Sequence, residues 1–276
     1  MAAQVSEKTV FRVAFVPMAL LALSTVYPIV FALNAALKTR RDYVLNRFGL
    51  TEEFTLQNFI QAWSQAKLGD YFVTSVVVTA GAVACLLLLA SLAGFGFAVL
   101  RFRGRRILFY LLLAALMIPV QVILVPFYQT MIALDLVNRR IGLIIAYTAF
   151  FTPFSVYLMT AFYASLPRSL AEAAAMDGAN LWQIWRMVFL PMGKPALFTL
   201  GILNTLYCWN DLLIALLVLQ KDRTLMVGVA SLRGEYTTNV PLLAAGVILA
   251  AVPVIAVYLF FQRRIVSGLT VGAVKG

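Results

Sequence analysis

The sequence contains no histidine, and only two of its 276 residues are cysteines. Histidine is the commonest metal ligand in proteins and the usual proton carrier near neutral pH, so its absence excludes the most frequent kinds of metal site and proton relay. Cys85 and Cys208 both lie inside long apolar stretches, where a structural disulfide at a membrane surface is not expected. We expect both to be small buried apolar residues.

Charge is also scarce, because only 12% of the residues are charged while 63% are hydrophobic. A soluble domain carries about 25% charged residues. Six apolar stretches reach the length of about 20 residues that one helical crossing of a bilayer needs. They run over about 13–33, 72–100, 107–131, 141–163, 196–219 and 242–262, and none contains Lys or Arg. The sequence therefore predicts an all-α, polytopic membrane protein with six transmembrane helices, in a single domain over 1–276.

A closed β-barrel is the other architecture that can cross a membrane. It needs segments of about 10 residues that alternate between apolar and polar, and stretches such as ACLLLLASLAGFGFAVL (84–100) do not alternate. The first apolar stretch is longer than the core of about 7–15 residues in a cleaved signal peptide. We therefore expect helices throughout, with the first one retained.

The orientation follows from the positive residues, which concentrate on the cytoplasmic side of membrane proteins. The short turn RFRGRR (101–106) carries four arginines and no acidic residue. With an even number of spans, this turn predicts that both termini lie in the cytoplasm. The net charge of +11 then reflects topology and contact with anionic membrane lipid. Basic and aromatic residues are not interleaved as in a nucleic-acid groove, so no nucleic-acid partner is expected.

The polar segment 164–195 separates the fourth and fifth apolar stretches. The run of alanines in SLAEAAAM favours a helix, and Asp177-Gly178 is a turn signal because glycine tolerates positive φ. Asn180 is a plausible N-cap for a second short helix. Leu181, Ile184, Trp185 and Val188 form one apolar stripe on that helix. This pattern alone fits a docking surface for another protein and an amphipathic helix pair resting on the membrane about equally well.

The segment resembles the cytoplasmic EAA loop of permease subunits in bacterial ABC importers. The match covers Glu172, Ala173, Ala174, Gly178, Leu190 and Pro191, with Val188 where the family usually has Ile. Over nearly its whole length, the chain resembles the second permease subunit of maltose-type carbohydrate importers. It is carried by AGFGFAVLRFRGRR (93–106), MIPVQVILVPFY (117–128), LPRSLAEAAAMDGA (166–179), CWNDLLIALLVL (208–219) and FFQRRIVSGLTVGAVKG (260–276).

The resemblance implies a type I ABC importer permease fold in the bacterial cytoplasmic (inner) membrane. It also implies a homologous second permease subunit, a dimer of ATPases and an extracytoplasmic solute-binding protein as partners. ATP and Mg would be bound by the partner ATPase, and no cofactor is expected on this chain. The implied ATPase-docking residues are Glu172, Ala173, Ala174, Ala175, Met176, Asp177, Gly178, Asn180, Leu181, Trp182, Trp185 and, in the tail, Val274, Lys275 and Gly276.

Polar residues inside the fifth apolar stretch are candidates for the solute path. Asp211 is the most informative, since an acidic residue at the centre of a membrane helix costs about 2.5–3.5 kcal/mol and such residues are functional candidates by default. Lining the solute path and bonding within the helix bundle remain open alternatives. The candidate path residues are Asn204, Tyr207, Trp209, Asn210, Asp211 and, in the third stretch, Gln121.

Three functions compete. The chain lacks a G-x-x-x-x-G-K-[ST] phosphate loop, so an ATP-driven transporter needs a separate ATPase. An ion-coupled secondary transporter needs coupling-ion sites and usually internal repeats, for which a lone Asp211 is weak support. A membrane-embedded enzyme has no metal-ligand cluster or nucleophile motif to support it. We therefore expect a sugar-importer permease that is not itself an enzyme.

The loop at 220–241 is expected to be external. Its Gly, Ser and Thr content suits a flexible segment that meets an external partner, and a plain connector between two spans fits equally well. The resemblance places it where relatives probe the sugar cleft of the binding protein.

Overall fold

The computed structural model describes the backbone of residues 7–235 and 239–273 and the side chains of residues 15–233 and 239–261. All named elements in these ranges are helices, and an isolated antiparallel bridge joins Lys38 and Phe54. The chain divides into two compact units. The first comprises residues up to 68 together with 229–252, and the second comprises 69–228 together with residues from 253 onward.

The first unit contains α1 (Glu7–Ala36), α2 (Arg40–Leu45), α3 (Gln57–Ile60), the π-helix η1 (Gln61–Gln65) and the start of α14 (Val240–Ala273). The carboxylate of Asp42 organises the loop after α2, because it accepts hydrogen bonds from the amides of Glu52 (3.1 Å) and Glu53 (3.4 Å) and from the Thr51 hydroxyl (3.2 Å). Burial acts to raise the pKa of Asp42. These hydrogen bonds and the charge of Lys38 outweigh burial, so the pKa lies below its ordinary value.

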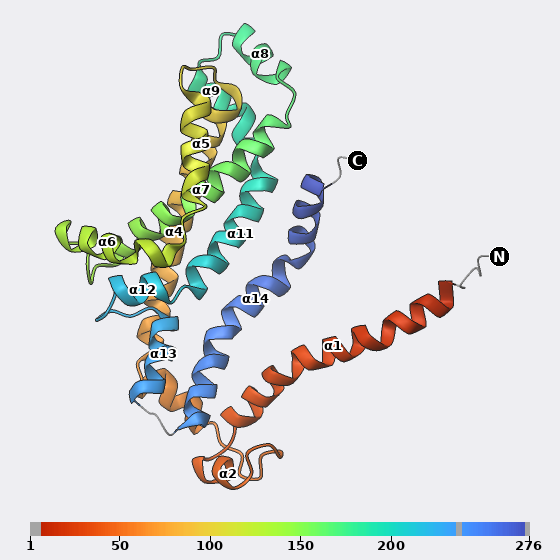
Figure 1. Ribbon diagram of the computed structural model, residues 1–276, viewed down its shortest axis with the longest axis vertical. Coiled ribbons are helices and arrows are strands. Elements are labelled where there is room, and N and C mark those ends of the chain that lie inside the picture. The colour runs from red at the N-terminus through yellow and green to blue at the C-terminus, as the bar shows by residue number, and fades with distance from the viewer. Residues whose placement is uncertain (1–6, 236–238, 274–276) are drawn as a thin grey trace. The chain divides into compact units, whose positions relative to one another are not determined.

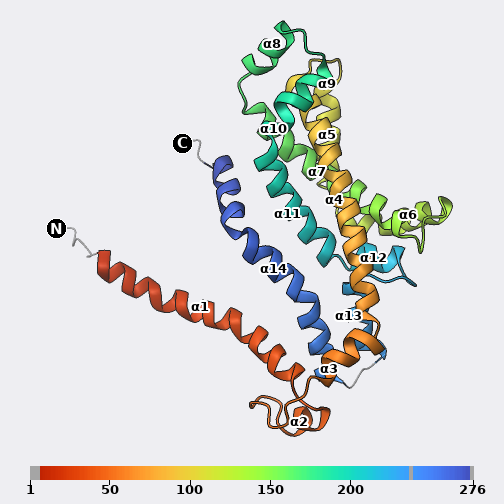
Figure 2. The ribbon, with the colours of Figure 1, turned by 180° about the vertical axis from the view of Figure 1, so that it is seen from behind.

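The second unit contains the segment 164–195 and the helices around it. They are α4 (Leu68–Val99), α5 (Arg105–Ala115), α6 (Val120–Ala133), α7 (Arg140–Ala164), α8 (Ser169–Met176), α9 (Leu181–Ile184), the π-helix η2 (Trp185–Phe189), α10 (Leu190–Met192), α11 (Lys194–Asn210), α12 (Leu213–Val218) and the start of α13 (Leu225–Glu235), whose residues from 229 onward belong to the first unit. Figures 1 and 2 both show α4, α7 and α11 side by side, with α8 and α9 at one end of them and α12 toward the other. The turn between α4 and α5 lies at the same end as α8 and α9.

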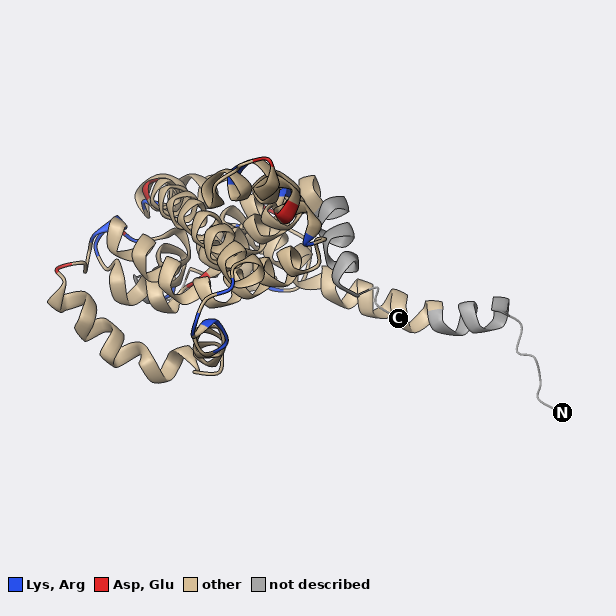
Figure 3. Ribbon diagram, turned by 90° about the horizontal axis from the view of Figure 1, so that it is seen from above, with Lys and Arg blue, Asp and Glu red and all other residues tan. Residues whose placement is uncertain are grey.

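The described helices fit a multi-pass membrane protein. Four of them are long and apolar enough to cross a bilayer, and the number reaches six if each of two bent helix pairs is one span. Most of the ribbon in Figure 3 carries no charged residue. The span Phe15–Ala36 has no buried residue in its most apolar window, as expected for a surface that meets lipid or another apolar partner.

The third predicted span, 107–131, is two helices rather than one. α5 and α6 are bent by 100° at a short break, and Pro119 occupies the N-cap of α6 in an extended conformation (φ −61°, ψ 130°). Proline has no N–H to donate and disfavours a helical residue before it, so the helix breaks at this point. The expectation of one continuous helix is therefore wrong here.

The fifth predicted span, 196–219, is also interrupted. α11 ends at Asn210, Asp211 is extended (φ −68°, ψ 131°), and α12 begins at Leu213.

The expectation that both cysteines are buried is wrong for Cys85, which is exposed on α4, whereas Cys208 is buried as expected. The single-domain assignment stays a prediction.

Two apolar clusters form the core of the second unit. One joins α4, α7 and α11 to the segment 164–195, and the other joins α4, α6, α7 and α12 near the opposite ends of these helices. α4 and α7 approach closely at Gly94, where an added Cβ would lie 2.7 Å from the Cβ of Met159 and 3.1 Å from its carbonyl carbon. The glycine therefore permits the close packing of these two spans.

Candidate functional site

The segment 164–195 folds as two short helical pieces joined by a tight turn. Gly178 adopts φ +81° after α8, a conformation that favours glycine. Asn180 then begins α9 with a complete capping box, in which its side chain accepts from the Gln183 amide (2.9 Å) and the Gln183 side chain accepts from the Asn180 amide (2.8 Å). The predicted turn and N-cap are both present.

α8 presents most of its predicted docking residues to solvent. Met176 is 89% exposed although it is apolar, and Ala171 and Ala174 are the half-buried residues through which the helix packs on the core. An exposed apolar side chain surrounded by small residues allows another surface to approach closely. Glu172, Ala173, Ala175, Asp177 and Gly178 are exposed as well.

The predicted apolar stripe of the second helix is divided between the interior and the surface. Ile184 and Trp185 are buried, Val188 is half-buried, and Leu181 is 58% exposed. Trp182 is 55% exposed, and its ring centroid lies 4.6 Å from that of Trp185. Trp185 was expected at the docking surface, and the structure places it in the core, where it has little surface to offer a partner.

Trp185 holds the segment to the membrane helices. Its indole Nε1 donates to Ser91 Oγ on α4 (3.0 Å), and this oxygen also lies 2.9 Å from the Tyr163 hydroxyl on α7. Phe189 packs against Tyr163 and Phe95, with ring centroids 5.6 Å and 5.1 Å apart. The buried hydrogen bonds and rings therefore connect the segment to two spans, α4 and α7.

The polar residues of α11 and its C-terminal end make contacts with α7. Asn204 is fully buried and donates to Ser155 Oγ (3.0 Å), and its Oδ1 has no hydrogen-bond partner within the described structure. Asp211 accepts from the Tyr147 hydroxyl (3.0 Å) and from the Ala215 amide (2.9 Å), so it caps α12. Asp211 therefore bonds within the bundle, which was one of the two alternatives left open for it, and Asn204 also bonds to a neighbouring helix.

The other candidate path residues differ in exposure. Tyr207 is 49% exposed and stacks on Phe151, with centroids 5.7 Å apart and planes 23° apart. Trp209 is buried and meets Phe72 edge-on, whereas Asn210 and Gln121 are exposed. Tyr207 thus offers an aromatic face that remains accessible.

Asp211→Ala is expected to destabilise the purified chain by about 2–3 kcal/mol, because it removes a helix cap and leaves the buried Tyr147 hydroxyl without its acceptor. Asp211→Asn keeps an oxygen that can accept from the Tyr147 hydroxyl, so its loss of stability is expected to be smaller. Thermal unfolding in detergent measures both. Equal losses in the two variants would contradict this role for the carboxylate.

The family model "Binding-protein-dependent transport system inner membrane component" matches residues 87–271. The chain belongs to this family of transport permeases. The match includes the whole segment 164–195, the whole of α7 and the part of α4 from residue 87 onward, where Ser91 and Phe95 lie.

Several curated permeases are similar over nearly their full lengths. The chain is 32% identical to the diacetylchitobiose uptake system permease protein NgcG of Streptomyces coelicolor, covering 99% of this chain and 92% of that one. It is 35% identical to the arabinooligosaccharides transport system permease protein AraQ of Halalkalibacterium halodurans, covering 94% of each. The melibiose/raffinose/stachyose import permease protein MelC of Bacillus subtilis is 31% identical, again with 94% of each chain covered.

A solved structure shares the fold of this permease. A chain in the crystal structure of a bacterial ABC transporter involved in the import of the acidic polysaccharide alginate superimposes with a TM-score of 0.82. It is 23% identical, and the match covers 94% of this chain and 98% of that one. The similarity supports the type I permease fold inferred from the sequence.

Two residues of the permease that hold the segment 164–195, Ser91 and Tyr163, were not predicted from the sequence. Ser91 is a single hydroxyl in an apolar stretch, where such a residue usually bonds to its own helix backbone. The predicted tail residues Val274, Lys275 and Gly276 lie outside the described residues.

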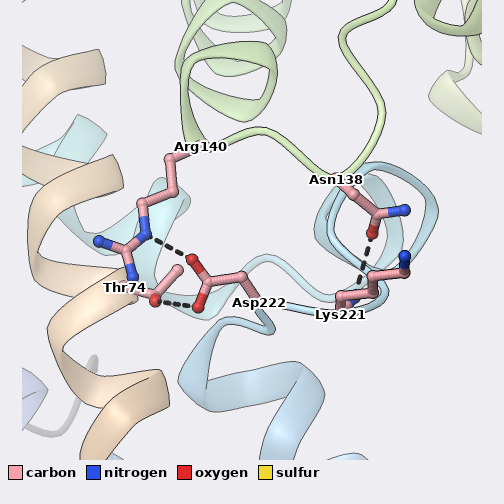
Figure 4. A network of polar contacts seen from close by, with 5 residues as sticks. All are labelled: Thr74, Asn138, Arg140, Lys221 and Asp222. Atoms are coloured by element: carbon pink, nitrogen blue, oxygen red, sulfur yellow. Dashed lines mark hydrogen bonds and ion pairs between the residues drawn. The ribbon is translucent and has the colours of Figure 1, made fainter.

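A polar network fixes the loop before α13, at the opposite end of the second unit of the permease from α8. Figure 4 shows the Asp222 carboxylate between Thr74 (3.0 Å) and Arg140 (2.6 Å). Asn138 Oδ1 accepts from the amides of Gln220 and Lys221. The hydrogen bond from Arg140 is the main cause that lowers the pKa of Asp222. The start of the loop 220–241, for which a flexible segment and a plain connector fitted the sequence equally well, is thus held by α4 and α7, and α13 follows it.

Proposed function

We propose that this chain is the permease subunit of an ATP-driven importer for a sugar or sugar-like solute. It forms half of a translocation path in the bacterial cytoplasmic membrane, with both termini in the cytoplasm. The observation that carries the proposal is the exposed segment 164–195, which turns at Gly178 and is held to the membrane helices α4 and α7. It occurs in a chain of the binding-protein-dependent permease family. The similarity to permeases named for diacetylchitobiose, arabinooligosaccharides and melibiose supports a carbohydrate as the solute.

The proposed partners are a homologous permease, a dimer of ATPases and an extracytoplasmic solute-binding protein. ATP and Mg are bound by the ATPase, and this chain binds no cofactor. The exposed docking surface comprises Glu172, Ala173, Ala175, Met176, Asp177, Gly178, Asn180, Leu181 and Trp182. Ala174 is half-buried beneath it and Trp185 anchors it, while Val274, Lys275 and Gly276 extend the ATPase contact.

ATP binding closes the ATPase dimer, the docking segment moves with it, and its buried contacts carry the movement to α4 and α7. The helices then change from inward-facing to outward-facing. Tyr207 is the proposed sugar-contacting residue of this subunit, because its accessible ring can stack on a sugar face. Asn210 and Gln121 supplement it with exposed amides.

Purification of the tagged chain from its native membrane tests the assembly. We expect a second permease and a protein with a nucleotide-binding phosphate loop to be retained, and mass spectrometry identifies both. A chain that is isolated alone and accumulates solute on an ion gradient would contradict the proposal and favour a secondary transporter.

A further inference from the structure

A basic pocket lies where the turn between α4 and α5 meets the end of α7 and the start of α8. Its volume is about 280 Å³, and Arg101, Arg105, Arg168 and Glu172 are the charged residues that line it. A wider hollow of about 810 Å³ shares the three arginines and adds Arg103 and Arg106. Five arginines from two separate segments therefore surround a space that contains a single carboxylate.

These arginines have no acidic partners in the described part of the chain. The ion pairs found there join Arg139 to Asp135 and Arg140 to Asp222, neither of which involves this pocket. Arg105 is oriented by a hydrogen bond from its guanidinium to the Leu100 carbonyl (3.1 Å). The excess of positive charge around a concave space suits an anion with several oxygen acceptors, such as a phosphate.

The helix that follows the arginines presents an apolar surface. α5 has no buried residue. Ile107, Leu108, Tyr110 and Leu111 are between 52% and 66% exposed, and they occupy the first two turns after the basic residues. A ligand that satisfies both features carries a negative head group at the arginines and an apolar chain along α5.

We propose that this pocket binds an anionic phospholipid, with its phosphate at Arg101, Arg105 and Arg168 and an acyl chain along α5. Glu172 forms one wall, so the head group would lie against α8 of the docking segment. An acidic protein surface satisfies the arginines but leaves the exposed apolar residues of α5 uncovered. The bound lipid would therefore connect the composition of the bilayer to the position of the docking helix.

The test is equilibrium binding of phosphatidylglycerol to the full-length chain in a neutral detergent, followed by native mass spectrometry. Phosphatidylcholine and inorganic phosphate are the comparison probes. The variant is the double substitution Arg101→Gln and Arg168→Gln, which leaves the backbone bond of Arg105 in place. Arg186→Gln is the matched control, because Arg186 is an exposed arginine of the same polar segment that does not line the pocket.

We expect phosphatidylglycerol to bind more tightly than phosphatidylcholine and the double variant to bind it about 30-fold more weakly, since each basic residue near an anionic lipid contributes roughly fivefold. The control should keep the affinity of the unsubstituted chain. Arg101→Lys with Arg168→Lys retains both charges and provides a variant that should fold and bind if the double glutamine variant does not fold.

Three results would overturn the proposal. Inorganic phosphate that binds as tightly as the lipid would identify a soluble anion as the ligand. A loss in Arg186→Gln equal to that in the double variant would show general charge attraction. Equal binding of both lipids would show that the arginines do not select an anion. Each outcome is independent of whether the chain co-purifies with an ATPase.

Discussion

Glu172→Lys and Gly178→Asp are expected to reduce ATP-driven uptake at least about 10-fold while the chain still inserts into the membrane, because loss of one central interface residue costs about 2 kcal/mol or more. Glu172 is exposed on α8, so reversing its charge changes the docking surface without disturbing the core. Gly178 has φ +81°, and a side chain there meets nothing within 4 Å. The cost is therefore strain in the turn, about 1–2 kcal/mol, together with a new negative charge at the surface.

Substrate-stimulated ATPase activity and solute uptake by the assembled complex measure this effect. Asp70→Lys is the matched control, since it reverses an exposed carboxylate in the first turn of α4 and lies outside the docking segment. Uptake and ATPase activity that remain unaltered in both docking variants would rule out the assigned role.

Trp185→Ala is expected to destabilise the chain by about 3–5 kcal/mol, the usual cost of removing a buried tryptophan side chain. The substitution also removes the hydrogen bond to Ser91 that connects η2 to α4. Transport should then fall relative to ATP hydrolysis, because the docking segment is held less firmly to the spans and only the packing of Phe189 and its neighbours remains. Thermal unfolding in detergent and the ratio of uptake to hydrolysis measure the two consequences.

The neighbouring Trp182→Ala provides the comparison. Trp182 is 55% exposed, so its truncation should weaken ATPase binding while lowering stability by less than about 1 kcal/mol. Trp185→Phe keeps an aromatic ring in the core and removes the indole N–H, whose hydrogen bond is worth about 1 kcal/mol, together with part of the packing volume, so its loss should lie below that of Trp185→Ala. Equal losses of stability in the two alanine variants would contradict the division between anchor and surface.

The positions of the membrane helices could be predicted because long apolar stretches have few other uses. The break at Pro119 was missed because proline also occurs inside continuous spans, as Pro153 does in α7. The interruption at Asp211 was missed because apolar character continues through α12. A stretch of apolar residues reports where the lipid lies and does not report where the helix bends.

The docking segment was predictable in outline and not in its orientation. Gly178 and Asn180 act through the local backbone, and both have the predicted conformations. The apolar stripe gave no indication of whether Trp185 faces a partner or the core, since either environment buries apolar area. Its partner Ser91 lies 94 residues away in the sequence, and only the packing of α4 against η2 brings the two together.

Transport by the purified complex in sealed vesicles distinguishes an ATP-driven importer from an ion-coupled transporter. The chain is reconstituted with its second permease, its ATPase and the solute-binding protein, and labelled sugar is followed with ATP on the ATPase side. We expect uptake that requires ATP and that falls at least about 10-fold in the Glu172→Lys variant. Uptake driven by an ion gradient without ATP would contradict it.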